Sequence, residues 1–447
     1  MAKIISKELV EYPFLEKPLS VYRFDNGHCA VLAYKKSPMI NVSSWVKTGS
    51  INENNENNGV SHFVEHLLFK GTHKYKAGVF DATMERLGGI INAATWKDYT
   101  FYYINIPKEH FQIALEMHAD MMTDAIFPND EIGSPFDIKG TPPDDKRERY
   151  VVIEEIRMGE DSNRRKVYKT LNNLMYDKHP YKREVIGTKE IISKISQEEI
   201  MRYYRTFYTP ENITTIVVGE FDEENIIDLI QKNFIFKDNS DIKKCIPDKK
   251  TPEFKIKNPL TKVNFANVNT GYIMLGALCD RADNLKETIT LDILATILGD
   301  GKSSRLYNKF ISKPSHPHFY QVEAYHYQFK DGDNFFIDAN FDPMYKDEVE
   351  DELKLELNNL SNITEEELYK AKKRAKVNFA QDTEMVSDIA DSIGFWMTVC
   401  SDISLPHKYL KVLDEIDVDY VQNIAKKYLN PDFMSASILL PELPQGE

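Results

Sequence analysis

Cysteine is scarce in this chain. The 447 residues include only four, Cys29, Cys245, Cys279 and Cys400, and none of them forms a Cys-x-x-Cys pair. This pattern indicates neither a disulfide framework nor a thiolate metal site. It favours a reducing compartment, so we expect a cytoplasmic protein.

Long apolar runs are also missing. No stretch approaches the roughly 18 uninterrupted apolar residues that a membrane-spanning helix needs. Residues 1–18 mix charged side chains with short apolar runs and lack the apolar core of a signal peptide. We therefore expect a soluble chain with no membrane partner.

Positive charge is in deficit, because 56 Lys and Arg residues face 70 Asp and Glu residues, for a net charge of −14. An acidic surface argues against nucleic acid as a partner. It allows an acidic chamber that would favour basic peptides, although a merely soluble acidic surface explains the charge equally well. The 42% hydrophobic and 28% charged residues are typical of a globular protein, and the length suits two domains.

The most informative segment present is His-x-x-Glu-His at residues 62–66. Apolar residues recur at helical spacing and no Pro or Gly interrupts residues 60–70, which predicts a helix with one buried face. On it, His62 and His66 lie one turn apart and can point two imidazoles at one zinc ion, with Glu65 beside them as a general base. The alternative is two histidines that fall by chance on a half-buried helix.

A third zinc ligand would have to come from elsewhere in the chain. Residues 146–159 predict a helix on which Glu148 and Glu155, two full turns apart, point the same way from a partly apolar face. Carboxylates in such a place need a cation, and zinc with two histidines lacks a third protein ligand. Two solvated surface glutamates are the alternative.

Periodicity and turn signals place further elements around these helices. Asp25-Asn26-Gly27 is a hairpin signal, because Asn and Gly accept positive φ. Strands are predicted at 21–24, 29–34, 40–48, within 90–106, at 213–218 and 271–278, within 319–341, and at 434–440. Helices are predicted at 80–87, 109–125, 286–298, 344–360 and 364–385, and exposed loops at 51–58 and 133–145.

The two halves of the chain resemble one another. Ile195 and Ile416 each precede a Pro by 15 residues, Pro210 and Pro431, and each Pro leads into an apolar strand. This repeat predicts two duplicated α+β domains. The expected division is a zinc-binding domain at 1–235, a Lys- and Pro-rich linker at 236–262, and a homologous domain without zinc ligands at 263–447.

These motifs resemble those of the pitrilysin (insulysin-like) zinc peptidases, in particular the half-length branch that includes the mitochondrial processing peptidase β subunit and its bacterial relatives. The resemblance covers essentially the whole chain. Besides His62-Phe63-Val64-Glu65-His66, it rests on Phe69-Lys70-Gly71-Thr72, residues 88–95, residues 148–156, Gly187-Thr188 and residues 298–306.

The resemblance implies one Zn²⁺ per chain, held by His62, His66 and Glu155. It implies that Glu65 is the general base that activates a zinc-bound water, and that Glu148 belongs to the catalytic site as a supporting group beside the ligands. The activity implied is that of a zinc metalloendopeptidase acting on extended peptides. The alternative is a non-catalytic assembly or peptide-binding subunit of the same ancestry.

Glu154 is the other candidate for the third ligand. Glu155 is preferred because it shares the face of Glu148 and because the family's ligand follows the Val-Val-Ile-Glu run by one residue. The interval between His66 and Glu155 exceeds the family's usual spacing, and the loop 133–145 accounts for the excess as an insertion near the chamber mouth.

The resemblance also implies how substrate binds and how each half folds. Asn92 and Ala93 would lie on an edge strand that an extended peptide joins through main-chain hydrogen bonds. Phe69 would floor a pocket for a large apolar side chain after the scissile bond. Each half would be an antiparallel-rich sheet covered by helices, and the two domains would form half of a clam-shell chamber.

One departure from the family pattern concerns the second half. Members that complete their own site carry an Arg and a Tyr soon after the Ser-Ser-Arg-Leu segment, where they stabilise the oxyanion. Residues 308–316 contain no Arg, and Tyr320 is the candidate for the Tyr. The resemblance therefore implies a dimer with a homologous subunit that lacks zinc ligands, or a homodimer.

Overall fold

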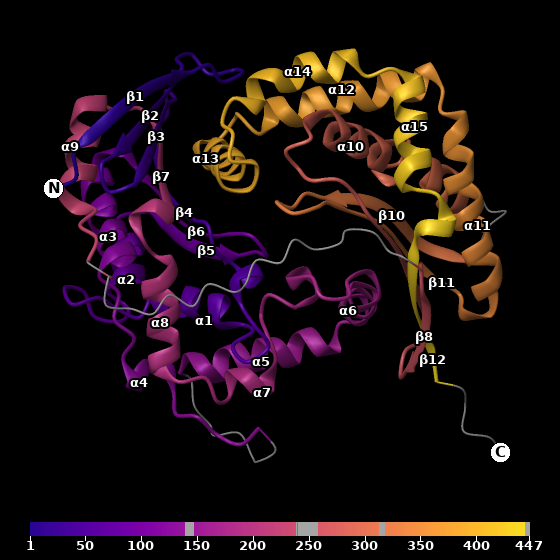
Figure 1. Cartoon of the computed structure of the whole chain (residues 1–447), viewed down its shortest axis with the longest axis horizontal. Helices are drawn as coiled ribbons and strands as arrows, with labels where there is room; N and C mark the ends of the chain where they lie inside the picture. The colour runs from indigo at the N-terminus through magenta and orange to yellow at the C-terminus, as the bar shows by residue number, and fades with distance from the viewer. Residues whose placement is uncertain (139–146, 238, 240–257, 313–317, 443–447) are drawn as a thin grey trace. The chain divides into compact units, whose positions relative to one another are not determined.

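The structure is a computed structural model of the chain that describes residues 1–138, 147–237, 239, 258–312 and 318–442 (Figure 1). The predicted α+β class is confirmed, since two sheets and many helices are present. No helix in the described ranges is long and apolar enough to cross a membrane. Two compact units form, Met1–Arg157 with Arg183–Lys249 and Ala380–His407, and Met158–Lys182 with Lys250–Phe379 and Lys408–Glu447.

The first unit is built on a seven-stranded sheet with the order β1-β2-β3-β7-β4-β6-β5. All neighbours in it are antiparallel except β3 and β7. The predicted hairpin joins β2 to β3, with Gly27 at a φ of 90°. The strands are β1 (Ile4–Val10), β2 (Leu19–Phe24), β3 (Cys29–Tyr34), β4 (Met39–Val46), β5 (Ile90–Thr95), β6 (Thr100–Pro107) and β7 (Ile213–Gly219).

Helices cover both faces of this sheet. Ser44 and Trp45 are successive residues of β4 and so point to opposite faces. Ser44 hydrogen-bonds His118 of α3, whereas Trp45 contacts Gly394 of α13. The helices that lie wholly or mostly in the first unit are α1 (Val60–Leu68), α2 (Val79–Arg86), α3 (Phe111–Thr123), α4 (Asn129–Ile132), α5 (Glu148–Asp161), α7 (Lys189–Ile192), α8 (Gln197–Phe207), α9 (Glu223–Asn233) and α13 (Val386–Phe395).

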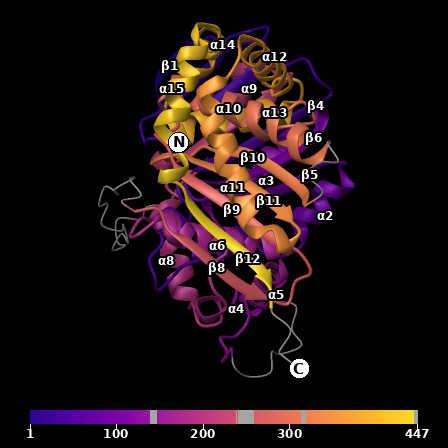
Figure 2. The same ribbon diagram turned by 90° about the vertical axis from the view of Figure 1, so that its right-hand side faces the viewer.

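The second unit is built on a five-stranded sheet with the order β10-β11-β9-β12-β8, seen face-on in Figure 2. Its strands are β8 (Thr261–Ala266), β9 (Gly271–Leu278), β10 (Phe319–Tyr327), β11 (Asn334–Phe341) and β12 (Ser435–Pro441). Its helices are α6 (Asn163–Met175), α10 (Leu285–Gly299), α11 (Lys346–Asn358), α12 (Glu365–Gln381), α14 (Leu405–Glu415) and α15 (Val418–Tyr428).

The two sheets repeat one plan. The order β3-β7-β4-β6-β5 in the first unit corresponds to β8-β12-β9-β11-β10 in the second. Each series has one parallel pair, β3 with β7 and β8 with β12, and it stands at the same place in both. The predicted duplication is therefore present in the topology, and the first unit adds β1 and β2 to the shared plan.

Each half of the sequence places one helix in the unit that is built mainly from the other half. Helix α6 groups with the second unit and packs on β9 and β12, where Gly276 leaves room for Leu171 and Met175. Helix α13 groups with the first unit and packs on β4 and β7, where Gly394 lies against the Trp45 ring. A Cβ at Gly276 would clash with Met175 and Leu171, and a Cβ at Gly394 would clash with the Trp45 ring.

Some expectations were met and some were not. The predicted helices and strands are present, and Thr364 caps α12 with Glu367 in reciprocal hydrogen bonds. The sequence did not predict β1 or β8, and β8 begins inside the segment expected as linker. The three described cysteines are buried. Cys245, and residues 139–145 of the loop predicted at 133–145, lie outside the described residues, and the domain boundaries stay a prediction.

Candidate metal centre

Helix α1 carries the His-x-x-Glu-His motif and packs as predicted. Five apolar side chains of the helix are fully buried in the core of the first unit, namely Val60, Phe63, Val64, Leu67 and Leu68. The side chains of His62 and His66 lie at the edge of that face and are 13% and 22% exposed. The burial of one face therefore directs both imidazoles towards solvent.

Glu53 fixes the N-terminal end of α1. Its carboxylate accepts hydrogen bonds from the backbone N–H groups of Gly59 and Ser61, each at 2.8 Å, from Asn58 Nδ2 at 2.7 Å and from the Ser61 hydroxyl. Helix N-terminal N–H groups lack partners within the helix and favour a negative charge. The sequence predicted only a loop at 51–58, so this anchoring residue was missed.

The structure brings His62, His66 and Glu155 together. One donor atom from each lies within 4.8 Å of the others, the single group of this kind in the described ranges. Glu155 Oε2 is 3.8 Å from His62 Nε2 and 3.6 Å from His66 Nε2. Two ligands of a tetrahedral zinc ion, each about 2.1 Å from the metal, lie about 3.4 Å apart. The three side chains therefore fit a zinc ion with small adjustments.

Glu154 and Glu155 have different surroundings. Glu154 is 59% exposed and forms an ion pair with Arg157 on the same helix. Glu155 instead points at the two imidazoles, with its side chain 49% exposed. The geometry supports Glu155 rather than Glu154 as the third ligand.

Glu148 contacts the ring nitrogen of His66 that does not face Glu155. Its Oε2 accepts a hydrogen bond from His66 Nδ1 at 2.9 Å, and its Oε1 lies 2.7 Å from Lys70 Nζ. Burial tends to raise the pKa of Glu148, but the bonds from His66 and Lys70 outweigh it and hold the pKa below its ordinary value. Glu148 is therefore ionised and directs the Nε2 lone pair of His66 towards the ligand position.

Glu65 is buried beside the two histidines. Its Oε2 accepts a hydrogen bond from the Thr95 hydroxyl at 2.5 Å. Burial raises the pKa of Glu65, and the nearby Glu155 adds to the rise, while Thr95 and His66 oppose it. A carboxylate with a raised pKa is better suited to take up a proton near neutral pH.

The predicted substrate-binding residues lie on or next to β5. This strand ends the sheet and pairs with β6, with Asn92 opposite Tyr103 and Ala93 opposite Tyr102. Phe69 follows α1 directly, and its ring centroid lies 6.2 Å from that of Tyr102. All three residues are therefore close to the element that carries the histidines, because α1 packs against β5.

The comparisons with known proteins agree with this site. Residues 30–189 match the family described as Insulinase (Peptidase family M16), and residues 194–375 match its Peptidase M16 inactive domain. The zinc protease PqqE of Helicobacter pylori is 30% identical over 410 residues, which cover 91% of this chain and 88% of that protein. The chain belongs to the M16 peptidase family.

Other similar proteins extend over the same length. The uncharacterized zinc protease YmxG of Bacillus subtilis is 26% identical over 422 residues, 93% of this chain and 97% of that protein. A crystal structure of a protease from Helicobacter pylori aligns with a TM-score of 0.83 at 27% identity, over 97% of this chain and 100% of that one. The predicted half-length branch of the M16 family is therefore confirmed.

Arg149 is a further residue that the sequence did not single out in this M16 chain. Its side chain is fully buried and donates hydrogen bonds to the carbonyl oxygens of Gly133, Ile192 and Ile195. Its guanidinium lies 5.6 Å from the ring of Phe63 on α1. Burial lowers the pKa of Arg149 to about 10. It links the start of α5, where Glu148 lies, to α7 and to α1.

The second M16 unit does not repeat the histidine motif. Tyr320, the candidate for the family's Tyr, lies on β10 and is 52% exposed. The segment from Asn308 to Ser312 contains no Arg, and residues 313–317 lie outside the described residues. The sequence departure noted above is therefore unchanged by the structure.

Proposed function

We propose that this M16 chain is a zinc-dependent endopeptidase that cleaves extended peptides. The convergence of His62, His66 and Glu155 within 4.8 Å, with Glu65 buried beside them, carries the proposal. Two imidazoles and one carboxylate are a catalytic zinc ligand set, which leaves a fourth position for water or substrate. The relatives named as zinc proteases support the same choice of metal.

The residues around the ligands have separate tasks. Bound zinc would act as a Lewis acid and bring the pKa of a water molecule towards neutrality. Glu65 takes the proton of the attacking water and returns it to the nitrogen of the leaving amine. Thr95 holds one oxygen of Glu65 in place, and Glu148 keeps His66 in the tautomer that presents Nε2 to the metal.

The substrate would bind as an added strand on β5. The strand ends the sheet, and its outer backbone groups can pair with an extended peptide. Asn92 and Ala93 would supply main-chain contacts, and Phe69 an apolar contact. This arrangement favours unfolded or short peptides over folded proteins, because only an extended backbone can pair with the strand.

Replacement of Glu65 by Gln tests the enzymatic proposal. We expect Glu65→Gln to keep about one zinc per chain, since Glu65 is not a ligand, and to lower peptide hydrolysis by at least about 10²-fold. Metal analysis and a fluorogenic peptide assay measure both quantities. Unchanged hydrolysis in Glu65→Gln would rule out the catalytic role, and a wild-type protein without zinc would rule out the metal.

We further propose that a second chain completes the site. It would be a homologous subunit without zinc ligands that supplies the Arg and Tyr, or a second copy of this chain. The absence of an Arg from residues 308–316 supports this proposal. Sedimentation velocity of the purified chain, alone and with proteins co-purified from its source, measures the assembly, and a monomer in both preparations would contradict it.

A second candidate function is that of a non-catalytic subunit that binds peptides. The same missing Arg favours it, together with the match of residues 194–375 to an inactive domain. The retained histidines and Glu65 favour the enzyme. Peptide binding without cleavage in every zinc-loaded preparation would select the second candidate.

A further inference from the structure

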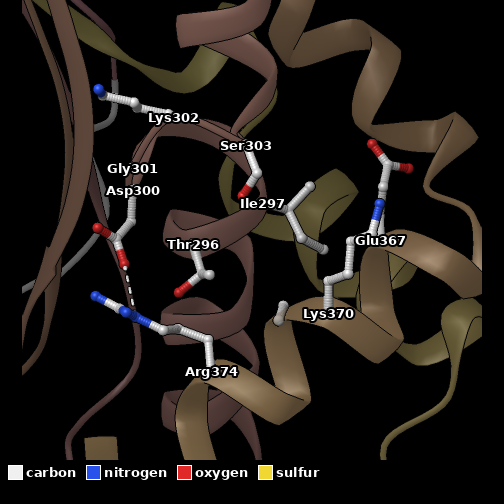
Figure 3. Close-up of a pocket in the computed structure, with 10 residues that line it drawn as sticks. Thr296, Ile297, Asp300, Gly301, Lys302, Ser303, Glu367, Lys370 and Arg374 are labelled. Carbon is white, nitrogen blue, oxygen red and sulfur yellow. Dashed lines mark ion pairs between the residues drawn. The ribbon is translucent and has the colours of Figure 1, made fainter. Parts of the chain in front are cut away.

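The second unit has a cavity at the place that corresponds to the metal centre of the first. In the first unit, α1 follows β4, the β5–β6 hairpin comes next, and α5 comes later. In the second unit, α10 follows β9, the β10–β11 hairpin comes next, and α12 comes later. The metal centre lies between α1 and α5, and a cavity of about 390 Å³ lies between α10 and α12 (Figure 3).

The residues that line this cavity repeat the spacing of the metal centre with different chemistry. Thr296 and Asp300 are four residues apart, as are the two histidines of α1, and Glu367 and Arg374 are seven apart, as are the two glutamates of α5. Where α5 has a carboxylate at the second of two positions seven residues apart, α12 has a guanidinium. The cavity keeps the position of the metal centre but has no histidine, and the described residues offer no second metal-ligating group.

The acidic residue Glu367 is already paired. Arg305 Nε and Nη2 lie 2.6 Å and 2.8 Å from its two carboxylate oxygens, and this bidentate pair lowers the pKa of Glu367 to about 2. The charge of Glu367 is thus neutralised by Arg305 and does not offset the cations of the cavity wall.

The cations that face the cavity are held loosely. Arg374 Nε is 3.8 Å from Asp300 Oδ2, and the two side chains are 58% and 46% exposed. A guanidinium has five N–H donors, so this contact leaves most of them unused by Asp300. Lys370, which also lines the cavity, pairs with Glu366 one turn earlier on α12; the two side chains are 62% and 75% exposed, and exposed pairs of that kind contribute little. Lys302 extends away from Thr296 and Arg374 (Figure 3).

We propose that this cavity binds a small oxyanion, a carboxylate or a phosphate group, through Arg374 and Lys370. Guanidinium groups recognise both anions through paired N–H donors, and the hydroxyls of Thr296 on α10 and of Ser303 just after it, across the cavity from α12, can donate further hydrogen bonds. The volume leaves room for a body attached to the anionic group. In the free protein Arg374 pairs with Asp300, so a bound anion has to compete with the Asp300 carboxylate.

Anion titrations of the purified, zinc-loaded chain test the proposal without any activity measurement. Sodium phosphate and sodium acetate are added in separate series at constant ionic strength, and the unfolding midpoint and the heat of binding are measured. A larger response to phosphate assigns a phosphate group, and a larger response to acetate assigns a carboxylate. A midpoint and heat that follow ionic strength alone in both series overturn the proposal.

Three variants locate the binding. We expect Arg374→Gln to weaken the affinity by about tenfold or more, because a charge-assisted hydrogen bond is lost. Lys373→Gln is the matched control, since it removes the same charge from an exposed neighbour on α12 that does not line the cavity. We expect Asp300→Asn to tighten binding severalfold, because the competing carboxylate is gone.

The variants also define the outcome that would contradict the proposal. Equal losses in Arg374→Gln and Lys373→Gln would indicate general attraction to a basic helix, and no gain in Asp300→Asn would indicate that Arg374 and Asp300 are only a structural pair. Either result overturns the proposal. Unchanged zinc content and circular dichroism confirm that each variant is folded.

Discussion

At the scale of single residues, two adjacent carboxylates of α5 offer a direct test of the ligand set. We expect Glu155→Gln to weaken zinc binding by more than the roughly 10–100-fold that loss of a supporting hydrogen bond costs, because it removes a donor atom. Glu154→Gln is the control, since Glu154 contacts Arg157 on the exposed side. Competition with a chromogenic chelator measures both affinities, and the reverse result would make Glu154 the ligand.

The sequence predicted some residues of this site and could not predict others. Helical spacing made His62, Glu65 and His66 candidates but left chance placement open, and the family pattern was needed to prefer them and to add Glu155. Arg149 was missed because its hydrogen-bond partners are backbone carbonyl groups, and Glu53 because two of its partners are backbone N–H groups, and backbone groups carry no sequence signal. Such residues are identified only once the loops they bind have been placed.

His326 has a buried side chain that lies between two aspartates of the second unit. Its Nδ1 is 2.7 Å from Asp292 Oδ1 and its Nε2 is 3.1 Å from Asp333 Oδ2. Ionised carboxylates only accept hydrogen bonds, so both ring nitrogens must donate and the ring is protonated. Burial opposes this charge, but the two aspartates outweigh it and raise the pKa of His326 to about 9.

The raised pKa predicts a pH-dependent stability. Because the folded pKa lies above the unfolded value of about 6.5, the stabilisation is complete below pH 6.5 and is lost as the pH rises through 9; it amounts to about 3 kcal/mol at most. Burial also raises the pKa of Asp333, which offsets part of this amount. We expect His326→Gln to lose more stability at pH 6.5 than at pH 9.5 in urea unfolding. An equal loss at both values would contradict the prediction.

At the scale of elements, the position of α1 depends on its N-terminal cap. We expect Glu53→Gln to lower the free energy of unfolding by about 1–2 kcal/mol, because the amide offers one acceptor and no charge to the N–H groups of Gly59 and Ser61. We also expect weaker zinc binding, since the histidines move with the helix. Glu56→Gln, in the exposed part of the same loop, is the control. Equal unfolding midpoints in the two variants would show that the cap does not stabilise α1.

The strands show where prediction from the sequence succeeded and failed. The β2–β3 hairpin is local and has an Asn-Gly turn, so its signal lies within a few residues. Strand β8 pairs in parallel with β12, and Thr261 lies opposite Ala436, so nothing near β8 in the sequence indicates a partner. Strand β1 is an edge strand with mostly exposed residues, so it lacks the alternation of buried and exposed positions that marks a strand.

At the scale of the whole molecule, the proposed second chain should control the rate. We expect the isolated chain to bind zinc but to cleave peptides slowly, because loss of one oxyanion donor costs about 10²–10³-fold in rate. Addition of the partner should raise the rate of peptide cleavage by the same factor. Peptide hydrolysis by the isolated chain, measured over a dilution series, distinguishes a homodimer from a complex with a different subunit. A homodimer loses specific activity on dilution. Full turnover by a sedimenting monomer would contradict the prediction.

The exchanged helices have a consequence for synthesis of the chain. The face of β4 and β7 that carries Trp45 is covered by α13, and Phe395, the end of α13, comes 176 positions after Gly219, the end of β7. At roughly 5–20 residues per second, the ribosome needs about 10–35 s to make that interval. A nascent first unit therefore waits with Trp45 and the rest of this face uncovered, and a chain truncated after residue 235 lacks the helix that covers it.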